Sequence, residues 1–99
     1  MFVNEMTRTM ILIDSIQKIK EFNSIMQQAP LKADLKLDKY IVDAASILGI
    51  YSIDTMKPIE LRIHGKGPKA DEMLNSINEY IVGDAPELSD LYEKERYVV

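Results

Sequence analysis

The chain has no cysteine and a single histidine, His64, among its 99 residues. Without cysteine there is no disulfide framework, no thiolate nucleophile and no zinc site with cysteine ligands. A single histidine excludes every site that needs two imidazoles. It leaves His64 as the one histidine that could serve as a general base, a phosphoryl carrier or a metal ligand. These absences exclude disulfides, cysteine-based sites and two-histidine sites before any motif is considered.

The sequence also lacks any apolar run near the roughly 20 residues that a membrane-spanning helix needs. Residues 1–5 show no basic start followed by an apolar stretch, the pattern of a signal peptide. The net charge is −4, from 12 basic and 16 acidic residues. An acidic domain of this size is a poor nucleic-acid binder. We therefore expect a cytoplasmic protein that binds neither a membrane nor nucleic acid.

The residues that are present are typical of one globular domain, with 46% hydrophobic and 28% charged side chains. Acidic residues gather at the end: residues 84–99 hold five acidic and two basic side chains, a net charge of −3. We predict a domain over residues 1–83, with its core at about 6–82, and an acidic C-terminal tail over 84–99. A short amphipathic helix and an unpacked segment both remain open for that tail.

Hydrophobic periodicity predicts the first half of the domain. Residues 6–13, rich in Thr, Ile and Met, predict a strand. Asp14, with Gln17 three residues later, predicts a capped helix that ends before Pro30. Residues 32–38 alternate between apolar and charged side chains, which predicts a half-exposed strand.

The second half continues the alternation of strands and helices. Residues 40–43 predict the return strand, and Ser46 predicts the N-cap of a short helix. Residues 58–64 predict a fourth strand, and a last helix runs from Pro68 to Ile81, with Gly83 as its C′ residue. The order β-α-β-β-α-β-α predicts an α+β open-faced sandwich, with a four-stranded antiparallel sheet and helices on one face.

The stretch Ala-Ser-Ile-Leu-Gly-Ile at residues 45–50, followed by Ser52, resembles one family closely. It is similar to the serine-bearing helix of HPr, the histidine-containing phosphocarrier family of the bacterial sugar phosphotransferase system. The element order extends this resemblance over about residues 6–82. The resemblance implies an HPr-like open-faced sandwich and a role connected with carbon regulation.

The reactive motif of that family is missing from the chain. HPr proteins carry Gly-Leu/Ile-His-x-Arg-Pro where the first strand meets the first helix, and residues 10–16 read Met-Ile-Leu-Ile-Asp-Ser-Ile. Asp14 places a negative charge where the family binds a phosphate dianion. We therefore expect neither phosphocarrier nor enzyme activity at this corner. His64 is expected at the end of the fourth strand, as a solvated side chain that nothing positions.

We expect no cofactor and no metal ion. Asp34, Asp38 and Asp43 are spread along a predicted hairpin and lack the spacing of a metal site. The sequence Gly-Lys-Gly at residues 65–67 lacks the pattern of a phosphate-binding loop and reads as a plain turn.

Ser46 is the residue for which the resemblance implies a role. In many HPr proteins the corresponding serine is phosphorylated by an ATP-dependent HPr kinase, which lets HPr bind a carbon-catabolite regulator. A phosphate on an N-cap serine lies against free helix amides and the positive end of the dipole. The alternative is that Ser46 only caps its helix. Both interpretations are open at this point.

Ile47, Leu48 and Tyr51 correspond to the apolar residues with which HPr docks its partners, and so short a helix can hardly bury all three. Three hypotheses follow. The first is an HPr-like regulatory or protein-interaction module without phosphocarrier chemistry, whose partner is an HPr kinase or a regulator. The second is a divergent phosphocarrier that uses His64. The third is a structural module that forms a homo-oligomer.

Overall fold

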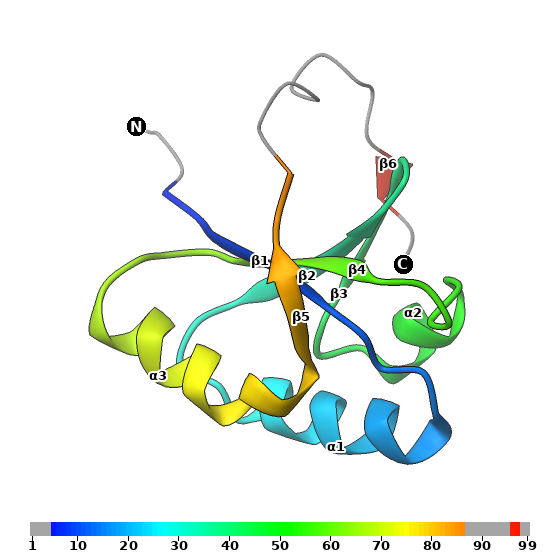
Figure 1. Ribbon diagram of the computed structural model, residues 1–99, viewed down its shortest axis with the longest axis horizontal. Coiled ribbons are helices and arrows are strands. Elements are labelled where there is room, and N and C mark those ends of the chain that lie inside the picture. Colours follow the sequence, from blue (N-terminus) through cyan, green and yellow to red (C-terminus); the bar gives the residue numbers. More distant parts are fainter. Residues whose placement is uncertain (1–4, 87–95, 98–99) are drawn as a thin grey trace.

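The structure, a computed structural model, describes residues 5–86 and 96–97. Its elements are, in chain order, β1 (Thr7–Ile11), α1 (Ile16–Gln27), β2 (Ala33–Leu37), β3 (Tyr40–Asp43), α2 (Ile47–Tyr51), β4 (Ile59–Ile63), α3 (Pro68–Ser76), the 3-10 helix η1 (Asn78–Tyr80), β5 (Ile81–Asp84) and β6 (Arg96–Tyr97). They form one sheet in the spatial order β5-β1-β4-β2-β3-β6, and α1 and α3 cover one of its faces (Figure 1). The predicted α+β class is confirmed.

The prediction of four strands was wrong, because the sheet gains a strand at each edge. β5 pairs antiparallel with β1, and the two-residue β6 pairs parallel with β3. β5 satisfies backbone groups that the edge of β1 would otherwise leave unpaired. It also carries the chain across the predicted domain boundary at residue 83. Residues 87–95 of the predicted tail lie outside the described residues.

The same edge pairing explains why the last predicted helix is too long. α3 ends at Ser76 instead of Ile81, and one 3-10 turn follows it. Gly83 is not a C′ residue, since it lies in β5 opposite Met10. The apolar residues near position 81 continue the helical period, so local pattern alone does not reveal that the chain has turned into the sheet.

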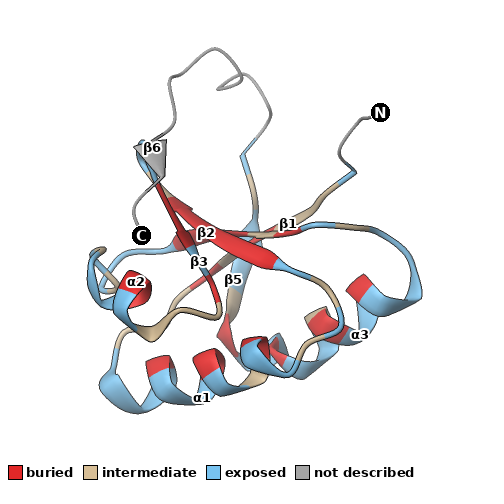
Figure 2. Cartoon of the chain, turned by 180° about the vertical axis from the view of Figure 1, so that it is seen from behind, coloured by how far each residue is buried: buried red, intermediate tan, exposed pale blue. Residues whose placement is uncertain are grey.

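The core lies between the sheet and the helices (Figure 2). Alternate residues of β1, β4 and β2 point into it, and α1 contributes the buried face that includes Phe22. The Phe22 ring meets the Tyr80 ring edge-on, with 6.1 Å between their centroids. The largest fully buried side chains are Phe22, Ile11, Ile13, Leu35, Ile50, Ile59, Leu61, Ile63, Met73, Ile77 and Val42.

The start of α1 differs from the prediction by one residue. Ser15, and not Asp14, is the N-cap, and its Oγ accepts a hydrogen bond of 3.1 Å from the Lys18 amide. Asp14 instead pairs with the Lys18 ammonium at 3.0 Å, and this hydrogen bond lowers the pKa of the carboxyl. Ile16, the first residue of α1, is 63% exposed.

The expectation of a half-exposed strand at residues 32–38 was also wrong. The polar side chains of β2, Asp34 and Lys36, are both buried. β2 lies between β4 and β3 and is therefore central in the sheet. The long charged side chains of β4 that lie opposite Asp34 and Lys36 cover the outer face of β2. Within residues 5–86 and 96–97, no helix has the length and apolar character to cross a bilayer.

Replacement of Phe22 by alanine should cost about 3–5 kcal/mol of unfolding free energy, because it leaves a cavity under the sheet. Ile16→Ala, which shortens an exposed side chain of the same helix, should change it by less than about 0.5 kcal/mol. Urea denaturation followed by circular dichroism measures both. Equal losses for the two variants would contradict the described packing.

Candidate functional site

Ser46 and α2 form the first candidate site. Ser46 has the extended backbone of an N-cap, and its Oγ accepts a hydrogen bond of 3.1 Å from the Gly49 amide. Serine is favoured at this position because its hydroxyl satisfies a donor that the first helical turn leaves free. The predicted N-cap is therefore confirmed, and the hydroxyl of Ser46 sits at the amino end of the helix.

The loop before α2 is tied to α1. The Asn23 amide donates to the Ala44 carbonyl at 3.4 Å, and the Gln27 amide donates to the Ala45 carbonyl at 3.2 Å. The Asp43 carboxylate accepts from the Ala45 amide at 2.8 Å. These contacts hold the peptide groups next to Ser46 in one conformation. A partner that binds there loses little backbone entropy in the protein.

The outer side of α2 is apolar and exposed. Leu48 is 77% exposed and Tyr51 is 48% exposed, whereas Ile47 is half-buried against the core. Ile50, on the inner side, is fully buried. We call Ile47, Leu48 and Tyr51 the α2 surface. Ile16, in the first turn of the helix that packs against α2, is a further exposed apolar side chain that the sequence pattern did not predict.

A second cluster lies on the sheet face opposite the helices. There the Asp34 carboxylate accepts from the Arg62 guanidinium at 2.8 Å and contacts His64 Nε2 at 2.6 Å. The Asp34 side chain is 4% exposed and that of His64 is 39% exposed. Beside them, Arg8 pairs with Glu60 at 2.8 Å.

The expectation that nothing positions His64 was therefore wrong. Asp34 is on β2 and His64 follows β4, and these strands are neighbours in the sheet. The residue pattern does predict that both side chains lie on polar strand faces. It does not say that the two strands are adjacent, so the contact could not be predicted.

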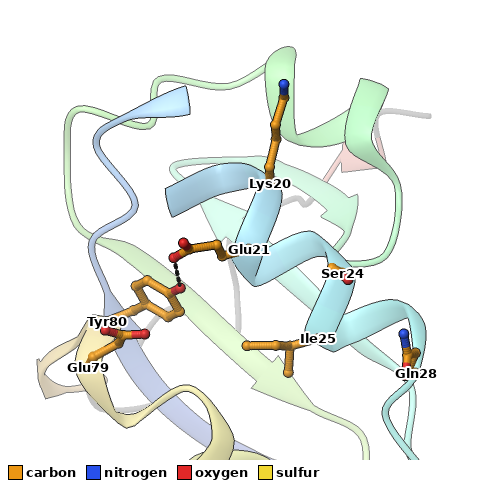
Figure 3. A pocket seen from close by; sticks show the side chains of 7 residues that line it. All are labelled: Lys20, Glu21, Ser24, Ile25, Gln28, Glu79 and Tyr80. Atoms are coloured by element: carbon orange, nitrogen blue, oxygen red, sulfur yellow. Dashed lines mark hydrogen bonds between the residues drawn. The ribbon is translucent and has the colours of Figure 1, made fainter. Parts of the chain in front are cut away.

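A hollow of about 590 Å³ lies between α1 and η1 (Figure 3). In its wall the Tyr80 hydroxyl donates to the Glu21 carboxylate at 2.9 Å. Burial, followed by this hydrogen bond, raises the pKa of Tyr80 far above its usual range. Hydrogen bonds from Gln17 and then Tyr80 lower the pKa of Glu21. These shifts come from contacts that join α1 to η1 and supply no reactive group.

Among the described residues, no group of three or more histidine or acidic side chains is arranged to hold a metal ion. Comparison of the chain with protein-family models, with curated proteins and with solved structures finds no match.

The stability of the protein should fall when the pH rises above about 10, the ordinary pKa of tyrosine. In the unfolded chain Tyr80 ionises there, whereas in the folded protein its raised pKa keeps the hydroxyl neutral. The contribution of Tyr80 to the free energy of unfolding is therefore complete below pH 10 and is lost as the pH rises above it. Tyr80→Phe should show a shallower decline. Urea midpoints between pH 8 and 11 test this, and parallel declines in both proteins would contradict the assignment.

Proposed function

We propose that this chain is a regulatory protein-docking domain, related to HPr and to the sugar phosphotransferase system, without histidine phosphocarrier chemistry at the first helix. Partners contact the α2 surface, and phosphorylation of Ser46 controls that contact. One observation carries the proposal: Leu48 is 77% exposed in a helix whose opposite side is buried and whose N-cap is the serine.

Apolar burial supplies the binding energy in this proposal. Leu48 and Tyr51 expose apolar area to water, and each Å² that a partner covers contributes about 25 cal/mol. Tyrosine is among the residue types that most often dominate binding energy in protein interfaces. Ile16 is a further exposed apolar side chain, on the helix that packs against α2.

A phosphate on Ser46 would change the charge of this surface. It adds about −2 charge and three acceptor oxygens at the amino end of α2, where helix amides favour an anion. The carboxylate of Asp43 is already held by the Ala45 amide, which limits its freedom to approach the phosphate. A partner with arginine side chains would gain contacts, whereas a purely apolar partner would lose affinity.

The corner between β1 and α1 supports the absence of phosphocarrier chemistry. The Asp14–Lys18 pair and the Ser15 cap occupy the start of α1, and the only histidine is on the other face of the sheet. Asp14 uses the Lys18 ammonium that could otherwise bind a phosphate. No imidazole is available there to accept a phosphoryl group.

Incubation with a bacterial HPr kinase and ATP should add one phosphoryl group to the protein, and Ser46→Ala should abolish the addition. Ser15→Ala is the matched control, because Ser15, like Ser46, is an N-cap serine that accepts from the amide three residues later, and it is the more exposed of the two. Intact-mass and peptide mass spectrometry give the result. An unmodified protein, or phosphate on Ser15, would refute this part of the proposal.

Leu48→Asp should raise the KM of the kinase for the protein roughly tenfold or more and leave kcat nearly unchanged, because it removes apolar contact but not the hydroxyl. Val82→Asp is the control, since Val82 is also exposed, at 53%, but lies on β5. Circular dichroism verifies that both variants fold. Equal kinetics for Leu48→Asp and the parent protein would exclude the α2 surface as the docking site.

A further inference from the structure

A groove between α1 and α3 is a surface that the docking function proposed above does not use. The hollow of Figure 3 adjoins a second one of about 260 Å³, since Ile25 and Gln28 line both. α1 forms one wall, and α3 with η1 forms the other. The second hollow is further lined by Ala29, Pro30, Glu72, Met73 and Ser76. We call the two hollows together the α1–α3 groove.

The middle of the groove is apolar. Ile25, which both hollows share, is half-buried against the core. On the opposite wall, Met73 of α3 and Tyr80 of η1 belong to the core cluster and are 1% and 3% exposed. A partner side chain that enters the groove therefore meets apolar atoms that the core already holds in place. Little conformational entropy of the protein is lost on such binding.

Both ends of the groove carry carboxylates. Burial, then the hydrogen bond to Glu21, and then the charge of Glu79 raise the pKa of Tyr80, so two carboxylates lie near one hydroxyl. That hydroxyl has one proton to donate, and Glu21 accepts it. Glu72 is at the other end. Lys20, which also lines the groove, points away from Glu21 and Tyr80 (Figure 3). Within the described part of the chain, no lysine or arginine forms an ion pair with these three glutamates.

The carboxyl ends of α1 and α3 add to this negative potential. α1 ends at Gln27 with Gln28 as its C-cap, and α3 ends at Ser76. Gln28 and Ser76 both line the second hollow. The last carbonyl groups of a helix carry roughly half a negative charge, which a basic residue in the last turn stabilises. Neither helix has a basic residue in its last turn. The groove thus joins an apolar middle to ends that favour cations.

We propose that the α1–α3 groove binds a basic segment of a partner protein, in which two arginine side chains flank one apolar side chain. Glu21 and Ala29 mark the two ends on α1, about 12 Å apart along the helix axis. In an extended peptide, alternate side chains point the same way at intervals of roughly 7 Å. Arginines four positions apart therefore reach both ends, and the residue midway between them covers Ile25. Each guanidinium can pair with a carboxylate through two hydrogen bonds.

The peptide acetyl-Arg-Ser-Leu-Ser-Arg-amide is the probe for this groove. Nitrogen-15 NMR of the full chain should show amide signals that move at Ser24, Gln28 and Ser76, with a Kd below about 1 mM. The affinity should fall as salt rises. Two control peptides, one with glutamate for both arginines and one with serine for leucine, should bind at least about fivefold more weakly. Spermine, a polycation without an apolar side chain, should also bind more weakly.

Glu79→Gln should weaken binding of the probe about two- to fivefold, because it removes one carboxylate and keeps the size of the side chain. Glu5→Gln is the matched control, since it makes the same change at an exposed residue that lines neither hollow. Gln28→Lys places a cation on an exposed residue of both hollows and should weaken binding roughly tenfold. Circular dichroism verifies that the variants fold.

No shift of the groove signals at millimolar probe would overturn the proposal. So would shifts confined to the α2 surface, spermine that binds as tightly as the probe, or equal affinity of Glu79→Gln and the parent protein. The kinase experiments on Ser46 and Leu48 do not involve the groove. Failure here therefore leaves the docking function of the α2 surface standing.

Discussion

The buried carboxylate of Asp34 is the constraint on which the outer face of the sheet depends. One of its oxygens accepts from Arg62 of β4 and so joins β2 to β4, and the other contacts His64, which follows β4 in the chain. A carboxylate that is 4% exposed is tolerable only if its oxygens are satisfied, and each of the two accepts one charge-assisted or imidazole contact. Loss of one partner of such a pair typically costs about 3–5 kcal/mol, because the remaining charge is left buried.

The same constraint sets the register of the sheet centre. Asp34 lies directly opposite Arg62, and a shift of β2 by one residue would turn the Asp34 carboxylate into the core. The Arg8–Glu60 pair repeats the arrangement between β1 and β4. Ion pairs thus specify the outer face while apolar side chains specify the inner one. The α2 surface lies on the helical side of the sheet, and hydrogen bonds from α1 to the loop before α2 hold it in place.

Local pattern predicted several features of the fold. The residue types at 40–43 predicted β3 with its observed bounds, and Ser46 was predicted as the N-cap of α2. Other features depend on pairing between distant segments. The adjacency of β2 and β4 buries Asp34 and brings it to His64, and β5 forms because β1 offers a free edge. Asp14 and Ser15 are both capable caps, so the choice between them follows from the chain's path.

Nitrogen-15 NMR of the single histidine tests the described geometry most directly. In the native protein, at a pH where the ring is neutral, we expect one tautomer, with the proton on Nε2 and the lone pair on Nδ1. Asp34→Asn should move the two nitrogen shifts toward those of free histidine. A native spectrum that shows the proton on Nδ1, or the averaged shifts of a freely exchanging imidazole, would contradict the central role of Asp34.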